Sequence, residues 1–347
     1  MRSPFNLSPF ISAALIRFAF CTAFCASCGP DGDEASRPPA ELGVWFQTPT
    51  AELPEKLSTL GLFPDSGEFE VVPDGVLAYQ PAYPLWSNGS LKYRHVVLPE
   101  GSTIDTTEDV WQYPVGTILF KTFVFETAQG IQPVETRLIR KLESGWDYAV
   151  FLWDDDGLDA TRIDLVRPVD VPVLTADGES FTHSVPNKYQ CRMCHEAGDH
   201  MILGLNPRQL ASAAGDPLNT WYEAGHLSKL PETPAPIEGD ELTRQVKEYA
   251  LGNCVNCHNG SGAPNSAYSL FPSDFIANTV GQPTQGNASA AGVRVVPGHP
   301  EQSILYLALL GNEENQEVKP MPPLGVQVRD AQAIAAFRAW IDDLDTP

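Results

Sequence analysis

The stretch TILFKTFVFET (117–127) decides the fold of the first half of the chain. Its aromatic and β-branched residues follow the period of two that is typical of a half-buried strand. The runs VETRLIRKL (134–142) and WDYAVFLW (146–153) continue this pattern between Gly, Pro and Asp turns. We therefore predict a β-rich domain over residues 51–182, an antiparallel β-sandwich or jelly-roll-like fold with a short amphipathic helix within 52–63.

From about residue 183 the sequence pattern changes and predicts short helices and loops. The first such segment covers 183–239 and ends in the Pro-rich spacer PETPAPIEG. The final region, 240–347, contains three stretches with amphipathic helical spacing, DELTRQVKEYALGNCVNCH (240–258), HPEQSILYLALL (299–310) and VRDAQAIAAFRAWIDDL (328–344). The expected fold class is therefore a multidomain α+β protein, with a β domain followed by mainly α segments.

Length and charge limit the functions that the chain can perform. Its 347 residues predict two or three domains, and a hydrophobic fraction of 43% is ordinary for a globular protein. The formal net charge of −22 and the absence of any long Lys/Arg run argue against binding to nucleic acid or to anionic lipid headgroups.

The N-terminus predicts export. An apolar run from Ile11 to Phe24 is too short to span a bilayer, which requires roughly 20 residues, and it reads as part of a signal peptide over 1–27. The residues before Cys28 resemble the lipobox of bacterial lipoproteins, in which that cysteine is the lipid anchor, although Cys25 stands where leucine is usual. Simple signal cleavage is the alternative. Residues 28–50 then form a flexible tether.

The cysteines left after export all lie in two C-x-x-C-H motifs. Of the seven cysteines, two depart with the signal and one is the candidate anchor, which leaves Cys191, Cys194, Cys254 and Cys257. These thiols precede His195 and His258 in the sequences CRMCH and CVNCH. An exported protein would normally use spare cysteines for disulfides, and this chain has none to spare.

Two thiols at positions i and i+3 share one face of a helical turn, and residue i+4 lies beside them. They can form thioethers with the two vinyl groups of one haem, while the adjacent histidine becomes an axial iron ligand. A Cys₄ zinc site is the first alternative, but 59 residues separate Cys194 from Cys254, against about 15–20 in zinc modules. Redox thiols are the second, and they normally need a βαβ context. We predict two covalently attached c-type haems, with His195 and His258 as ligands.

The segment around CVNCH resembles a small class I cytochrome c domain over about 240–345, where a helix, the motif, further helices and the sequence KPMPPLG follow in order. In that family a methionine in an MPP loop is the distal iron ligand, and Met321 occupies the matching position. The neighbouring prolines stiffen this loop. A thioether opposite histidine would stabilise Fe(II) and raise the reduction potential.

The segment around CRMCH lacks such a loop. Its candidate distal ligands are Met201, His200, His226, His183 and His95, and an open iron position is the alternative. Met201 follows His195 by only six residues, which at ~3.3 Å each could barely carry the chain around the haem edge. We therefore predict that Met201 is not the ligand.

Several longer stretches resemble a poorly characterised family of exported bacterial dihaem c-type proteins. They are LSTLGLF (57–63), YPLWSNGSLKYRHVVLP (83–99), YPVGTILFKTF (113–123), VETRLIRK (134–141), GWDYAVFLWDDDGLDA (145–160) and VPNKYQCRMCH (185–195). The resemblance implies an N-terminal β domain and a C-terminal cytochrome c-like domain, with no assigned substrate.

Two functions follow as expectations. The first is electron transfer with redox partner proteins in the periplasm or at the cell surface, with membrane contact only through the lipid anchor. The second is a peroxidase-like haem enzyme, in which the haem at CRMCH is open to substrate and the Met-ligated haem supplies electrons. The spin state of each haem distinguishes them.

Overall fold

Six strands form one antiparallel sheet in which every strand pairs with its neighbour in the sequence. The structure is a computed structural model, and it describes residues 42–63, 69–199, 202–261, 268–285, 291–311 and 317–345. The strands are β1 (Val76–Ala78), β2 (Leu91–Val97), β3 (Ile118–Thr127), β4 (Gly130–Leu142), β5 (Gly145–Trp153) and β6 (Ala160–Arg162). A separate hairpin consists of β7 (Val169–Leu174) and β8 (Ser180–Val185).

The sheet confirms the predicted antiparallel β domain but not the jelly-roll-like connectivity. Only residues 128–129 connect β3 to β4, and only 143–144 connect β4 to β5. Connections of two residues can join only adjacent antiparallel strands, so the sheet is a meander. The helix expected within 52–63 is also shorter than predicted. It is a single 3-10 turn, η2 (Leu57–Leu60), which ends at Gly61 in the left-handed conformation with φ 66°.

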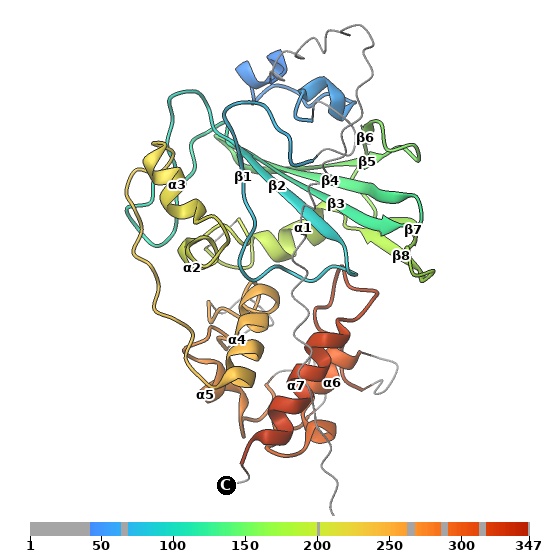
Figure 1. Ribbon diagram of the computed structural model, residues 1–347, viewed down its shortest axis with the longest axis vertical. Coiled ribbons are helices and arrows are strands. Elements are labelled where there is room, and N and C mark those ends of the chain that lie inside the picture. The colour runs from blue at the N-terminus through green and yellow to red at the C-terminus, as the bar shows by residue number, and fades with distance from the viewer. Residues whose placement is uncertain are drawn as a thin grey trace, which may run out of the picture. The chain divides into compact units, whose positions relative to one another are not determined.

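The two faces of the sheet have different coverings (Figure 1). On one face, η2 and the preceding turn η1 (Val44–Gln47) pack against a cluster that includes Phe120, Leu138 and Phe151. The other face carries Val96 and Leu119, which pack against Leu210 of α2 (Pro207–Ala211) and Trp221 of α3 (Pro217–Glu223). This second face is the one that the helix α1 (Lys188–His195) also contacts, through β5.

The C-terminal region is helical. Its elements are α4 (Glu241–Asn253), α5 (Phe275–Thr279), η3 (Pro300–Gln302), α6 (Ile304–Leu310) and α7 (Ala331–Asp343). The helices predicted near 240–258 and 328–344 correspond to α4 and α7, which pack directly on each other. Phe337 and Trp340 of α7 are almost fully buried in this core, as their i, i+3 spacing requires.

Residues 39–347 form one compact unit, so the β-rich and helical regions belong to the same body. The boundaries expected at 182/183 and 239/240 stay predictions. The signal peptide (1–27), Cys28 and all but the end of the tether (28–50) lie outside the described residues.

Candidate functional site: two adjacent C-x-x-C-H motifs

The first motif lies on α1, a helix of eight residues that begins immediately after a capping box. The Asn187 side chain accepts a hydrogen bond from the Gln190 N–H (2.9 Å), and the Gln190 side chain accepts one from the Asn187 N–H (3.0 Å). This reciprocal pair satisfies two helix-terminal donors and fixes where the helix starts. Cys191 is buried and Cys194 half-buried, and both lie on the helix at i, i+3 spacing.

His195 ends α1 close to the sheet. Its ring lies 5.9 Å, centroid to centroid, from the ring of Tyr148 on β5. The Tyr148 hydroxyl donates a hydrogen bond of 3.3 Å to Glu196, which also pairs with Arg192 one turn earlier on the helix. Burial raises the pKa of Tyr148, and the Glu196 carboxylate raises it further, so the phenol stays protonated. The tyrosine therefore anchors the end of α1 to the sheet.

The second motif begins where α4 ends. Cys254 is the C-cap of α4, and its carbonyl accepts hydrogen bonds from the N–H groups of Cys257 (3.1 Å) and His258 (2.8 Å). The chain thus makes one further turn, which brings the two thiols to the same side. Burial raises the pKa of Cys254 to about 12, which keeps that thiol protonated.

The His258 ring, the Tyr268 ring and the Arg294 guanidinium group lie next to one another. The His258 ring lies 4.8 Å from Tyr268, and the Arg294 guanidinium carbon lies 3.7 Å above the centre of the Tyr268 ring. Burial lowers the pKa of His258, and the Arg294 charge lowers it further. Five buried side-chain atoms of the described residues lack a hydrogen-bond partner. Three of them are His95 Nδ1, Thr117 Oγ1 and Trp340 Nε1, and the other two, His258 Nδ1 and Arg294 Nη2, lie at the second motif.

These orphaned atoms fit a bound group with acceptor atoms, because unpaired buried donors are costly and rare. The donor set of each motif, two thiols and an imidazole, also matches covalent c-type haem.

The structure brings the two motifs together. Asn259 Nδ2 and Ser261 Oγ both donate to the Ala197 carbonyl, at 3.4 and 3.3 Å. Gly198 permits this approach, since a Cβ there would lie 2.5 Å from Asn259 Nδ2. The residues just after His195 therefore contact those just after His258, although the motifs are far apart in the sequence.

The Cys194 and Cys257 thiols also lie close enough to affect each other's ionisation, and all four motif cysteines are free thiols. This contact lowers the pKa of Cys194 to about 7 and raises that of Cys257. Within the described ranges, no three His, Cys, Asp or Glu side chains converge as ligands of a metal ion. The four cysteines are thus not arranged as a tetrahedral Cys₄ cluster.

Met321 lies half-buried in the segment between α6 and α7. Its N–H donates to the Ala308 carbonyl of α6 (2.9 Å), and its carbonyl accepts from Arg329 (3.3 Å). The Met321 backbone is therefore bonded to α6 and to the segment just before α7, and neither bond uses the thioether.

The histidines proposed as distal ligands of the first motif have other environments. His95 lies on β2 opposite Phe120, so it faces the sheet side covered by η2, and its ring packs 5.5 Å from Phe63. That is the face away from α1. Burial lowers its pKa to about 4. His226 is half-buried after α3, where its carbonyl accepts from the Ile104 N–H. His200 and Met201 lie outside the described residues.

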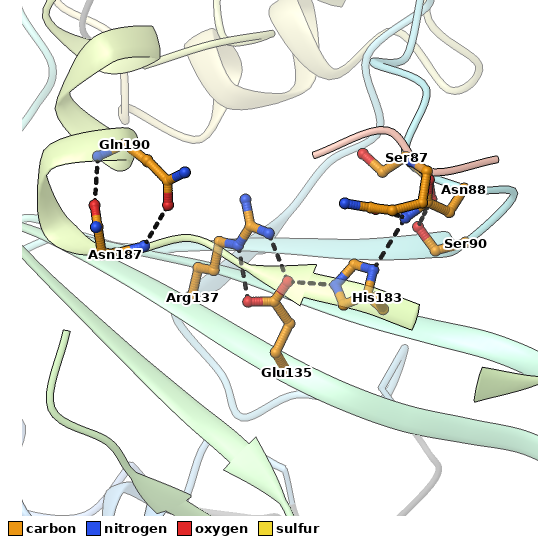
Figure 2. A network of polar contacts seen from close by, with 9 residues as sticks. Ser87, Asn88, Ser90, Glu135, Arg137, His183, Asn187 and Gln190 are labelled. Carbon is orange, nitrogen blue, oxygen red and sulfur yellow. Dashed lines mark hydrogen bonds and ion pairs between the residues drawn. The ribbon is translucent and has the colours of Figure 1, made fainter. Parts of the chain in front are cut away.

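His183 uses both ring nitrogens in a buried network (Figure 2). The Asn88 carbonyl oxygen accepts from the N–H groups of Gln327 (2.6 Å) and Val328 (2.9 Å), which fixes the orientation of the amide. The Asn88 NH₂ group must then donate to His183 Nδ1 (3.4 Å). Nε2 therefore carries the proton and donates to Glu135 (2.8 Å). In this arrangement His183 positions Glu135 and offers no free nitrogen to iron.

Glu135 is completely buried and also binds Arg137 with both carboxylate oxygens, at 2.9 and 2.5 Å. Burial raises its pKa, but the Arg137 charge and the His183 hydrogen bond outweigh burial and lower the pKa to about 2. Glu135, Arg137 and Asn88 were not among the residues predicted from the sequence. The Asn-Gly pair at 88–89 does signal a tight turn, and both residues have positive φ.

A cavity of about 540 Å³ lies beside both motifs. Arg94 and Lys121 of the sheet line one part of it, and Gly198, Val255 and Asn259 of the two motif segments line another. Cavities of this size typically hold small ligands.

Comparison with family models, curated proteins and solved structures finds no match for this chain. Among the described helices, none is both long and apolar enough to cross a membrane.

Proposed function

We propose that this chain is an exported dihaem c-type cytochrome that transfers electrons between redox partner proteins in the cell envelope. One observation carries the proposal. Two C-x-x-C-H motifs, each with its thiols at i, i+3 spacing on a helical turn, lie in contact through Ala197, Asn259 and Ser261.

Within this proposal each residue has a distinct role. Cys191 and Cys194 would hold the first haem, Cys254 and Cys257 would hold the second, and His195 and His258 would each supply an imidazole ligand to iron. Covalently bound c-type haem supplies reversible one-electron chemistry at its iron. Met321 would supply the thioether ligand of the second haem, in a helical region proposed to be cytochrome c-like. Cys28 is the proposed lipid anchor.

The contact between the motif segments supports electron transfer inside the chain, because it keeps the two attachment sites next to each other. The tyrosine-anchored end of α1 and the capped start of the helix hold the first site rigidly against the sheet. The packing of α4 on α7 holds the second. Rigid supports reduce the structural rearrangement that accompanies a change of charge.

A second candidate function is a peroxidase-like haem enzyme. The cavity beside the first motif favours this function. So do the two histidines, because both ring nitrogens of His183 are hydrogen-bonded and His95 lies on the face of the sheet away from α1. A vacant coordination position next to a polar cavity is what a small oxidising substrate requires.

One experiment tests both candidates. The full chain is produced in cells that mature c-type cytochromes, and covalent haem is counted after denaturation by the pyridine haemochrome assay. Two haems per chain support the proposal, and zero or one contradicts it. Electron paramagnetic resonance then gives the spin states. Two low-spin haems favour electron transfer, whereas one high-spin haem that binds cyanide favours the enzyme.

A further inference from the structure

Three cations stand directly opposite one another on adjacent strands. In the register of the sheet, Arg94 of β2 faces Lys121 of β3, and Lys121 faces Arg137 of β4. We call these three residues the cation row. Like charges directly opposite on neighbouring strands destabilise a sheet, so the row needs a compensating feature. Lys92 lies two residues from Arg94 on the same face and adds a fourth positive charge.

Among the described residues, one carboxylate forms an ion pair with these four cations. Glu135 binds Arg137 with both oxygens, and the remaining terminal nitrogen of Arg137 points away from that pair (Figure 2). Arg94 donates to the neutral Gln80 side chain (2.7 Å), and Lys92 donates to the Ser90 carbonyl (2.8 Å).

Lys121 lies 4.8 Å from the centre of the Phe123 ring, which offsets only part of a charge. Over the described ranges, none of Arg94, Lys92 and Lys121 forms an ion pair with a carboxylate. Negative charge is abundant in this chain, at net −22, yet among the described residues Glu135 is the one carboxylate that forms an ion pair with the row.

The row lies at the first motif and opens into the cavity. Arg137 lies close enough to Cys191 and Cys194 to interact with their ionised thiolate forms. Lys121 lies close enough to Cys194 to do the same. Arg94 and Lys121 line the cavity of about 540 Å³. Two carboxylates also line it, Asp109 and Asp199, but both are exposed to solvent.

The pKa directions agree with a surplus of positive charge. Burial lowers the pKa of Lys121 well below its usual value, and the neighbouring Arg94, Arg137 and Lys92 lower it further. Burial likewise lowers the pKa of Lys92 to about 7. The row can respond in two ways, by releasing protons from its lysines or by holding an anion.

We propose that the cation row, with Lys92, binds a pair of carboxylates beside the first motif. A charge of about −2 balances Arg94 and Lys121 once Glu135 has neutralised Arg137, and guanidinium and ammonium groups bind carboxylates through strong charge-assisted hydrogen bonds. The carboxylates come from one of two sources, the two propionates of the haem at the first motif or a free dicarboxylate in the cavity. The propionate source rests on the proposed function, whereas the charge argument does not.

The test compares Lys121→Met with Lys141→Met. Each lysine lies over one aromatic ring, Lys121 over Phe123 (4.8 Å) and Lys141 over Trp146 (5.0 Å). Both face the same side of the sheet, but the cross-strand partner of Lys141 is Trp146 rather than a cation. Methionine keeps the apolar contact and removes the charge in both variants. Lys121→Arg, which keeps the charge, is the rescue variant.

Thermal unfolding of the full chain is measured in dilute buffer, with added disodium succinate or with sodium chloride of equal ionic strength. If the ligand is a free dicarboxylate, succinate raises the wild-type midpoint above the chloride control. Lys121→Met then weakens succinate binding about tenfold or more, while Lys141→Met and Lys121→Arg keep it.

If the ligand is propionate, succinate has no specific effect, yet Lys121→Met lowers the unfolding midpoint more than Lys141→Met does. It also lowers the reduction potential of one haem, because a positive charge next to that haem has been lost. Two results overturn the proposal, provided that succinate has no effect. Either Lys121→Met raises the midpoint, as removal of an uncompensated repulsion would, or the two Met variants behave alike.

Covalent haem is counted on the same samples. A chain without haem contradicts the proposed function, and the succinate titration then decides the carboxylate site by itself. In that case a missing succinate effect overturns the carboxylate site as well.

Discussion

The two C-x-x-C-H motifs share a pattern of five residues but have opposite supports. The first lies on a short capped helix against a charged sheet face, with Arg137 and Lys121 near its thiols. The second ends a helix of thirteen residues that packs on α7 through apolar side chains, and Val255 within the motif is itself buried in that core. The local motif therefore determines only which atoms can bind a group. The surrounding structure determines whether charged or apolar side chains lie next to that group.

This difference has a consequence for the proposed haems. Charge and burial around an iron centre are among the main determinants of its potential. We therefore expect two different potentials, with that of the first site sensitive to charge changes in the sheet. The potential of the second should depend on its axial ligand.

The largest expected effect is loss of one attachment site at a time. Cys194→Ala and Cys257→Ala should each weaken covalent loading at one site only, so that the count falls from two haems per chain toward one, because the changed site keeps a single thioether. The pyridine haemochrome assay on denatured protein measures this. Met193→Ala, an exposed position within the first motif, is the control and should retain both haems. Loss of both haems in either cysteine variant would show that the two sites do not load independently.

Next in size is the distal ligand of the second site. Met321→Ala should lower one of the two reduction potentials by an amount on the order of 0.2 V and leave the other unchanged, since the soft thioether that stabilises Fe(II) is lost. The charge-transfer band between sulfur and ferric iron, near the red end of the spectrum, should disappear. Spectroelectrochemical titration measures both. Met193→Ala is again the methionine control, and an unchanged band would assign the ligand elsewhere.

A smaller effect concerns the buried carboxylate beside the first motif. The pKa of Glu135 in the folded chain is lowered to about 2, so its contribution to stability is fully present above the ordinary value of 4.5. That contribution should be lost as the pH falls from about 4.5 to about 2, and it amounts to about 3 kcal/mol.

Glu135→Gln should therefore destabilise the protein near pH 7. It should also reduce the pH dependence of the free energy of unfolding between about pH 4.5 and about 2, here called the acid limb. Urea unfolding as a function of pH measures both effects. Glu143→Gln, in the exposed turn between β4 and β5, is the matched control. If the acid limb keeps its slope in Glu135→Gln, other carboxylates are responsible for it.

The smallest expected effect is the loss of stability when the helix cap before either motif is removed. Asn187→Ala removes the capping box of α1, and Asp240→Ala removes the side-chain cap of α4, which accepts from the Thr243 N–H. Each should cost about 1 kcal/mol in the free energy of unfolding. Asn187→Ala should also lower haem loading at its motif more than Asp240→Ala does, because α1 has only eight residues, whereas α4 has thirteen and packs on α7. Equal loading in both variants would contradict the difference in support inferred above.

Local patterns determined much of this protein. The period-two runs predicted the long strands, and the i, i+3 spacing predicted helices that correspond to α4 and α7. Each motif brings two thiols and an imidazole together within five residues, so the haem prediction follows from the sequence without knowledge of the fold, and it stays a prediction. These features depend on the conformation of a few consecutive residues, which neighbouring side chains specify.

The tertiary structure alone decided the rest. The contact of Cys194 with Cys257 and the alignment of Arg94 with Lys121 join residues from separate elements. In the sequence Arg94 and Lys121 are isolated basic residues inside two strands. They lie opposite each other only because of the register of β2 and β3, and register depends on turns and on the burial of both sheet faces. His183 likewise was a candidate ligand until Asn88 and Glu135 were found on its two nitrogens, which only the folded chain brings together.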